Sequence, residues 1–172
     1  MKRIALTALL LGSAGLWSAP ASALNLLGNC SVSATATAGF GVYDTLSASN
    51  NDSAGGSVTF TCYSLASLLG GTIPFTIKLN NGLWGAFPQR AMNSDSGGNK
   101  LNYNLYTSTA RTTIWGDGTS GTGVKSGSFH YPALIGIGVK REETHYFYGR
   151  IPANQNVPAG TYSDSITVTV VY

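Results

Sequence analysis

Hydrophobic and polar residues alternate with a period of two along most of the chain. In the clearest segments every second residue is apolar and the residues between are Ser, Thr, Asn or Lys: 57–62, 75–80, 101–105 and 165–170. This pattern predicts β-strands with one buried face. Two further strands are expected at 31–37 and 145–151, and a weaker one at 134–140, where Gly136 and Gly138 interrupt the apolar run.

Turn-forming residues separate these segments. Gly, Ser, Asn and Pro are concentrated in four connectors: 47–56, 93–100, 116–127 and 153–160. No window has a helical period, and 65–69 supports at most a short turn. Many short strands with regular turn signals predict an all-β sandwich or barrel. Neither a domain boundary nor an internal repeat is visible in the sequence.

The amino terminus predicts export. Lys2 and Arg3 precede an uncharged apolar run over 4–17, and the small residues Ala21 and Ala23 follow it. This order is typical of a secretory signal peptide cleaved after Ala23. An uncleaved membrane anchor is the alternative, but the apolar run is shorter than the roughly 20 residues needed to span a bilayer. We therefore expect a signal peptide at 1–23 and one mature domain at 24–172, with no transmembrane segment in the mature chain.

Charge excludes one class of partner. Removing Lys2 and Arg3 lowers the formal net charge by two, from +3 to +1, so the basicity belongs mostly to the export signal. Only 10% of residues are charged, which is low for a soluble domain. Without a cluster of Lys and Arg, no nucleic-acid partner is expected.

The two cysteines, Cys30 and Cys62, predict a disulfide. In an oxidising compartment an even pair is more often bridged than free. A metal site is the weaker alternative, because the only histidines, His130 and His145, are far from both cysteines in sequence. The bridge would close a loop of about thirty residues, worth very roughly 3 kcal/mol. We expect no metal and no other cofactor.

Catalytic signals are weak throughout. Residues 95–98 (Asp-Ser-Gly-Gly) resemble a protease nucleophile loop, but both histidines lie downstream of it, unlike in that family. Residues 93–97 resemble the start of a calcium loop whose twelfth position would be Asn104 rather than Glu. Glu142 and Glu143 are adjacent and point to opposite faces of a strand, whereas paired acid–base work needs converging carboxylates. The remaining acids are expected to form turns, among them Asp44, Asp52, Asp117 and Asp164. We expect no enzyme and no catalytic residues.

Three aromatic residues in glycine-flanked turns have two interpretations. Trp84 and Phe87 lie in the turn 82–88, and Trp115 precedes Gly-Asp-Gly at 116–118. The rings either plug the end of a sandwich, which is the more ordinary reading, or form a surface platform for a sugar or an apolar surface. We keep Trp84, Phe87 and Trp115 as candidate adhesion residues.

Landmarks along almost the whole mature chain together resemble one family. They are Cys30, 40–44 (Phe-Gly-Val-Tyr-Asp), 58–62, 75–79 with Gly82, Arg90 and Met92, 101–106 (Leu-Asn-Tyr-Asn-Leu-Tyr), Arg111, 115–118 (Trp-Gly-Asp-Gly), 148–152 (Tyr-Gly-Arg-Ile-Pro), 160–164 (Gly-Thr-Tyr-Ser-Asp) and 166–172. In this order, behind a signal peptide, they resemble the spore coat protein U domain family, whose members include the pilins of archaic chaperone–usher pili.

The resemblance implies an incomplete immunoglobulin-like β-sandwich that lacks its final strand and leaves an open groove. In that family a periplasmic chaperone first lends a strand to the open edge. The amino-terminal extension of a neighbouring subunit later replaces it, at an outer-membrane usher, and the product is displayed on the cell surface as a pilus or coat. Here the docking strand would present alternate residues of the last segment: Ile166, Val168, Val170 and Tyr172.

One departure from the family concerns strand donation. Cleavage after Ala23 would leave only residues 24–29 ahead of Cys30, which span at most about 20 Å. We therefore expect a subunit that accepts a strand but donates poorly, as a fibre-tip subunit would. The alternative to a structural or adhesive subunit is a free-standing secreted carbohydrate-binding module.

Overall fold

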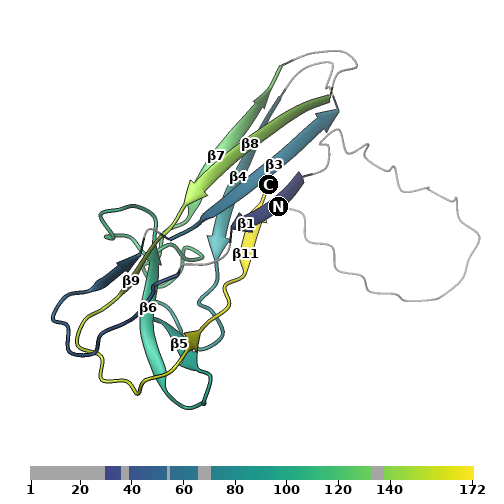
Figure 1. Ribbon diagram of the computed structural model, residues 1–172. Coiled ribbons are helices and arrows are strands. Elements are labelled where there is room, and N and C mark those ends of the chain that lie inside the picture. Colours follow the sequence, from purple (N-terminus) through teal and green to yellow (C-terminus); the bar gives the residue numbers. More distant parts are fainter. Residues whose placement is uncertain (1–29, 36–38, 54, 66–70, 133–137) are drawn as a thin grey trace, which may run out of the picture.

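The computed structural model describes residues 30–35, 39–53, 55–65, 71–132 and 138–172, and every regular element in these ranges is a β-strand (Figure 1). The predicted all-β class is confirmed. The expected signal peptide, the short donor segment 24–29, the turn at 66–69 and much of the weak strand at 134–140 lie outside the described residues. No helix long and apolar enough to cross a membrane occurs in the part of the chain described.

Two three-stranded antiparallel sheets form a sandwich. The first has the order β1-β3-β8 and the second has the order β11-β4-β7. Their bounds are β1 (Cys30–Thr35), β3 (Ser57–Leu65), β8 (Gly138–Tyr146), β11 (Val168–Val171), β4 (Gly71–Leu79) and β7 (Lys125–Tyr131). The ring of Phe60 in β3 packs against Phe75 in β4 and Phe129 in β7, with centroid distances of 5.0 and 5.5 Å.

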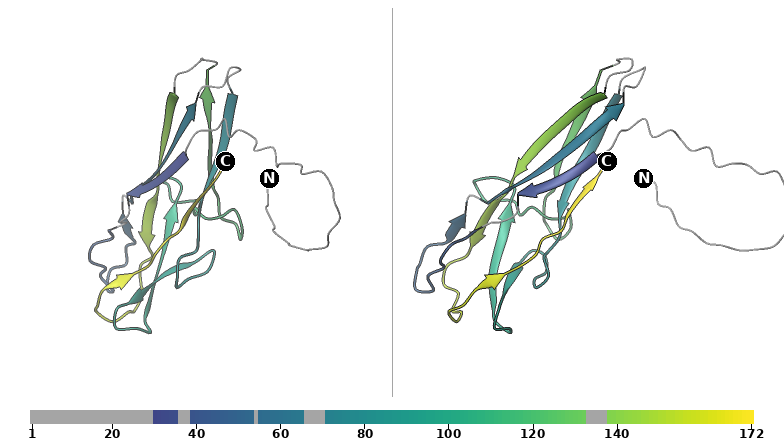
Figure 2. Two further views of the ribbon diagram at one scale, coloured as in Figure 1. Left: turned by 90° about the vertical axis from the view of Figure 1, so that its right-hand side faces the viewer. Right: turned by 45° about the vertical axis from the view of Figure 1, so that its right-hand side comes forward.

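A five-stranded sheet continues one end of the sandwich (Figures 1 and 2). Its order is β10-β5-β6-β9-β2, all antiparallel. The bounds are β10 (Tyr162–Ser163), β5 (Arg90–Ser94), β6 (Lys100–Tyr106), β9 (Tyr148–Ile151) and β2 (Asn51–Ser53). Extended chain passes from one sheet to another at two places: Phe147 alone separates β8 from β9, and residues 164–167 separate β10 from β11.

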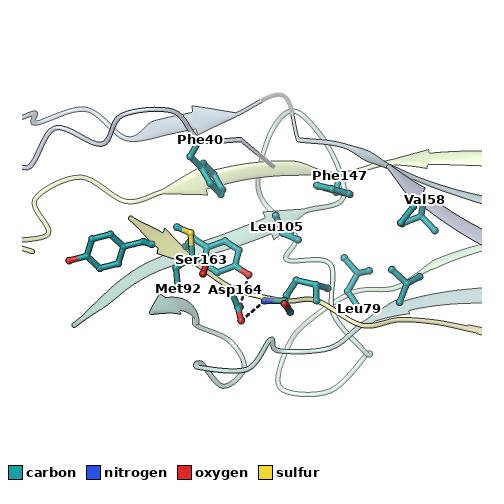
Figure 3. Close-up of a pocket in the computed structure, with 14 residues that line it drawn as sticks. Phe40, Val58, Leu79, Met92, Leu105, Phe147, Ser163 and Asp164 are labelled. Atoms are coloured by element: carbon teal, nitrogen blue, oxygen red, sulfur yellow. Dashed lines mark hydrogen bonds between the residues drawn. The ribbon is translucent and has the colours of Figure 1, made fainter. Parts of the chain in front are cut away.

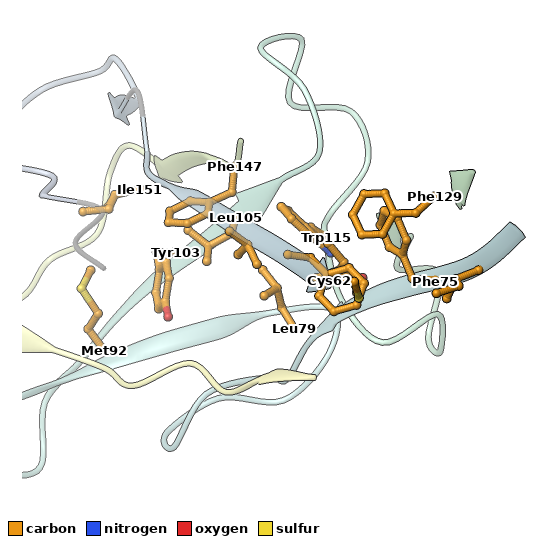
Figure 4. Close-up of a cluster of buried hydrophobic side chains, with 14 of the residues drawn as sticks. Cys62, Phe75, Leu79, Met92, Tyr103, Leu105, Trp115, Phe129, Phe147 and Ile151 are labelled. Carbon is orange, nitrogen blue, oxygen red and sulfur yellow. The ribbon is translucent and has the colours of Figure 1, made fainter. Parts of the chain in front are cut away.

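The core follows the alternation of the sequence. Apolar residues at alternate positions of β3, β4 and β6 are buried while most residues between them are not: Val58, Phe60, Cys62, Phe75, Ile77, Leu79, Leu101, Tyr103 and Leu105. The labelled core side chains in Figure 4 form one row, from Met92 and Ile151 in the five-stranded sheet to Phe129 in the sandwich. The strands predicted from alternation in these segments are confirmed.

Four strands, β2, β5, β7 and β10, were not predicted, for different reasons. β2 and the start of β7 fall in segments expected to be connectors, and β10 has only two residues. In β5, Arg90, Ala91 and Met92 are all buried in succession, so no period of two exists there. Burial on both faces comes from the tertiary structure around β5, which a local pattern does not contain.

Candidate functional site

One side of the sandwich has two unpaired strand edges. β1 pairs only with β3 and β11 only with β4, so neither has a neighbour on its outer edge among the described residues. The opposite side is bridged, because Nε of Arg141 in β8 donates to the carbonyl oxygen of His130 in β7 at 3.0 Å. Unpaired edges present backbone N–H and C=O groups that can pair with another chain. The open side is therefore the candidate site.

A cavity of about 410 Å³ lies on this open side (Figure 3). Ala34 from β1 and Val168 from β11 both line it. Figure 3 shows Phe40 and Phe147 on one side and Leu79 and Asp164 on the other. The lining is mostly apolar and includes Val58, Leu79, Met92, Leu105, Phe147 and Ile166. Such a lining suits the apolar side chains of an inserted segment.

A second hollow of about 890 Å³ continues the first over the five-stranded sheet. Phe40, Met92 and Tyr162 line both cavities, so the two form one groove. The walls of the second section are the segments 39–45 and 157–162, and the buried side chains of Leu101 and Ile151 contribute to its lining. The groove therefore extends from β11 past β10. We call it the acceptor groove.

The carboxyl-terminal segment forms one wall of the acceptor groove. From residue 161 to 170 exposed and half-buried residues alternate strictly, and the half-buried set is Tyr162, Asp164, Ile166, Val168 and Val170. The apolar members stay only half-buried although their alternation is as regular as that in β3. This is the pattern of a strand whose inner face is only partly covered by the described residues.

Of the predicted docking residues, Ile166 and Val168 line the groove and Val170 is half-buried beside them. Tyr172 is 58% exposed, yet its ring centroid lies 5.5 Å from that of Phe60. The structure thus brings all four onto one wall. Their role in docking stays a prediction.

Among the residues that the structure describes, no strand pairs with the outer side of this wall. The N–H of Asn80 donates to the carbonyl oxygen of Thr167. In an antiparallel ladder the N–H and C=O groups of every second residue face the same neighbour, so those of Thr167 and of every second residue after it face β4. The N–H and C=O groups of Val168 and Val170 consequently point away from β4, toward the open edge. Strand addition needs such groups.

Side chains replace the ladder where residues 164–167 leave it. Asn80 Oδ1 accepts from Thr167 N–H at 2.8 Å. Asp164 Oδ1 accepts from the N–H groups of Leu83 and Ser165, both at 2.8 Å, and Oδ2 accepts from the Tyr103 hydroxyl at 2.7 Å. Burial, followed by the bond to Asp164, raises the pKa of Tyr103, which keeps its proton. Gly82 is required here, because a side chain at this position would collide with the Asp164 carboxylate.

A buried arginine supports the same wall from beneath. Arg90 is fully buried, and its Nε and Nη2 donate to the carbonyl oxygen of Asn80 at 3.0 and 2.7 Å. Nη2 also donates to the carbonyl oxygen of Trp115 at 2.7 Å, and the guanidinium lies 5.0 Å from the centroid of the Phe87 ring. Burial lowers the pKa of Arg90 to about 10, so the side chain is still charged at neutral pH. Arg90 therefore fixes Asn80, which holds Thr167.

The disulfide fixes the opposite wall. Cys30 and Cys62 are bonded, and they are opposite each other in the β1–β3 ladder with Cα atoms 4.1 Å apart. The predicted pairing is confirmed. Since β3 is the one strand that pairs with β1 in the described part of the chain, this bond anchors the strand that borders the groove.

Trp115 was a wrong candidate for surface adhesion. Its side chain is fully buried, and Nε1 donates to the carbonyl oxygen of Ile77 at 3.0 Å. The next residue, Gly116, accepts from Leu79 N–H. The pairing of β7 with β4 ends at Lys125, and residues 115–116 take the place of β7 beside the end of β4. This position puts the Trp115 ring in the core.

The other two candidate aromatics differ in exposure. Phe87 is half-buried against Arg90, whereas Trp84 is 42% exposed beside Leu83, which is 65% exposed. Of the three aromatics, only the Trp84 ring is exposed enough to act as a surface contact. An adhesive role for it stays a prediction.

The residues weighed for catalysis do not converge in the described ranges. Ser96 lies in a hairpin turn, where its hydroxyl bonds to that of Ser94 at 2.7 Å. His130 contacts Thr72, and His145 lies between the sheets near Phe75 and Trp115. No group of three or more His, Cys, Asp or Glu residues in these ranges is placed to hold a metal ion.

Asp52 has a structural role instead. Both of its oxygens accept from Arg150, at 2.7 and 2.8 Å, and Arg111 Nη1 lies 3.3 Å away. The hydrogen bonds from Arg150, aided by the charge of Arg111, hold the pKa of Asp52 below its usual range. Arg111 also donates to the carbonyl oxygens of Gly149 and Ser53. The cluster ties β2 to β9.

An antiparallel β-sandwich with an apolar groove between two open edges defines the class of this protein. The profile of the Spore Coat Protein U domain matches residues 17–169, and the chain belongs to this family. The resemblance seen in the sequence is confirmed. Among curated proteins, the chain is 32% identical over 161 residues to Protein U of Myxococcus xanthus, covering 86% of this chain and 80% of that protein.

Among solved structures, the chain is similar to one in the CsuC–CsuE chaperone–tip adhesion subunit pre-assembly complex from the archaic chaperone-usher Csu pili of Acinetobacter baumannii. The identity is 23% and the TM-score is 0.46, over 84% of this chain and 39% of that one. The chain thus spans about two fifths of the length of the matched structure.

Proposed function

We propose that this protein is a structural or adhesive subunit of a secreted pilus or coat, and that it assembles by accepting a β-strand from another chain. The carrying observation is the acceptor groove, with unpaired edges of β1 and β11 on either side. Membership of the Spore Coat Protein U domain family supports the same role. The partners are a periplasmic chaperone, an outer-membrane usher and neighbouring subunits, and the destination is the cell surface. The protein acts without catalysis.

The physical reason is the incomplete burial of the carboxyl-terminal wall. Ile166, Val168 and Val170 present apolar side chains at alternate positions, and none is fully buried. An inserted strand would remove that apolar surface from water, worth about 25 cal/mol for each Å². It would also pair the outward peptide groups of Val168 and Val170.

The test is Val170→Pro with Val170→Thr as the matched control. Proline removes only an N–H that points away from β4, so the existing ladder is kept. Threonine keeps that N–H and the branched shape of valine. The mature chain is produced in a periplasm with and without a chaperone from the same pilus system, and soluble yield and co-purification are measured.

We expect the wild type and Val170→Thr to need the chaperone and to bind it, and Val170→Pro to lose binding. A wild-type chain that is a stable monomer without any chaperone would refute the proposal. Together with quenching of Trp84 fluorescence by a sugar, that result would support the carbohydrate-binding alternative. The predicted preference for accepting over donating a strand concerns residues 24–29 and stays a prediction.

A further inference from the structure

Asp164 places a carboxylate in the wall of the first, mostly apolar section of the acceptor groove. It is half-buried between the two sections of the acceptor groove and lines the first (Figure 3). Three donors of this chain approach it: the N–H groups of Leu83 and Ser165 and the hydroxyl of Tyr103. A carboxylate has about four lone-pair positions, so one acceptor position is left over.

A strand entering the groove would remove water from this carboxylate. Burying a charged group without a full set of hydrogen bonds is costly, and an apolar side chain against Asp164 would impose that cost. A hydroxyl or amide donor would instead occupy the remaining position, and hydrogen bonds to a carboxylate are stronger than those between neutral groups. The best residue opposite Asp164 is therefore not the best residue for the rest of the groove.

The regular wall fixes where that residue must lie. A strand added along the open edge places one inward side chain opposite each half-buried residue of the wall. Val168 lies with Val58 and Leu79 in the first section, and Tyr162 lies with Phe40 and Met92 where the two sections meet. Asp164 is the single charged position between these apolar clusters.

We propose that the accepted strand carries a hydrogen-bond donor, Ser, Thr or Asn, at the one inward position opposite Asp164, with apolar residues at the inward positions on both sides. The inference rests on the proposed function and adds a sequence rule for the partner. It also makes Asp164 a register signal. A strand displaced by two residues would place an apolar side chain on the carboxylate and a polar one on an apolar cluster.

The test uses the mature chain with its own added strand. About ten residues of alternating Val and Thr, joined to Tyr172 by an Asn-Gly hairpin turn, are long enough to pass from β11 to β10 at ~3.3 Å per residue. Three versions differ only at the inward position opposite Asp164, which is Ser, Val or Glu. In a fourth, the Ser is moved two residues so that it faces Ile166. The soluble yield of each without a chaperone is compared with that of the unextended chain, and the melting temperatures of the extended versions are compared with one another.

We expect the Ser version to melt highest, about 4 °C above the Val version, and the Glu version to melt lowest. The displaced Ser should lose this advantage, since it no longer meets the carboxylate. If Val equals or exceeds Ser while all extensions stabilise the chain, the register rule is wrong and the proposed function stands. If no extension stabilises the chain, the groove does not accept a strand and the proposed function fails as well.

Discussion

Replacing the buried tryptophan should cost far more stability than replacing the exposed one. Trp115→Phe and Trp84→Phe make the same chemical change at two sites that look alike in sequence, each a tryptophan next to a glycine. Trp115 is fully buried, whereas Trp84 is 42% exposed. The pair therefore tests where the structure places these two rings.

The magnitude for Trp115→Phe has two parts. The Ile77 carbonyl loses the Nε1 donor at 3.0 Å, and a buried acceptor left without its partner costs about 1–3 kcal/mol. The smaller ring leaves a void that costs about 1 kcal/mol more. The expected loss is about 2–4 kcal/mol in the free energy of unfolding. Trp84→Phe removes no hydrogen bond of the indole ring, and we expect a change within about 0.5 kcal/mol.

Because the chain alone is expected to need a chaperone, the assay uses the mature chain carrying the added Ser strand described above. Its equilibrium unfolding in urea is followed by far-UV circular dichroism, so that the loss of an indole does not affect the signal. Each variant also keeps one of these two tryptophans. The emission of Trp115 should be blue-shifted and resistant to acrylamide, and that of Trp84 should be quenched readily. Equal losses of stability in the two variants, or a loss below about 0.5 kcal/mol for Trp115→Phe, would refute the placement of Trp115 in the core.

Three further predictions follow from individual contacts. Replacing both Cys30 and Cys62 by Ala should lower the free energy of unfolding by about 3 kcal/mol, as measured in urea, and reductant should have the same effect on the wild type only. Arg111→Lys should lower the free energy of unfolding by about 2 kcal/mol, because lysine cannot make the forked hydrogen bonds to the carbonyl oxygens of Ser53 and Gly149. Arg150→Lys changes a more exposed ion pair and should cost under about 1 kcal/mol in the same assay. Burial, together with the nearby Lys125, lowers the pKa of His145 in the folded chain below its ordinary value of 6.5, although Glu143 at 3.1 Å acts in the opposite direction. The unfolded chain therefore binds more protons, and stability falls as the pH decreases below about 6.5. The variant His145→Gln should make the melting temperature less dependent on pH between pH 7.5 and pH 5, and an unchanged slope would contradict this.

The sequence predicted β3, β4 and β6, whose burial is largely one-sided, but missed β7, which begins with Lys-Ser-Gly-Ser. In β3, Val58, Phe60 and Cys62 face the core and alternate with polar residues, so a local pattern records the fold. The pattern fails in β5, where Arg90 to Met92 are buried in succession. Three hydrogen bonds to the carbonyl oxygens of Asn80 and Trp115 hold the Arg90 side chain there, and these partners lie 10 and 25 residues away in sequence.

In the candidate site, too, the sequence predicted the features that depend on local pattern and missed those that depend on distant contacts. The alternation of Ile166, Val168 and Val170 predicted one wall of the groove, and the two cysteines predicted the bond that anchors the other. Asp164 was expected to be only a turn former, because its partners Leu83 and Tyr103 are far away in sequence. Trp84 and Trp115 could not be separated, because the end of the β7 ladder decides which ring is buried, and no local signal marks that end.

An apolar groove of this length raises the question of what prevents its walls from collapsing onto each other. Each wall is fixed from its inner side. The disulfide holds β1 to β3, and Asn80 and Asp164 hold residues 164–167 where the ladder is interrupted. Because these bonds use inner groups, the outer peptide groups of Val168 and Val170 stay available. The bonds that complete the wall are thus the same ones that keep its edge open, and the proposed strand would enter without breaking any of them.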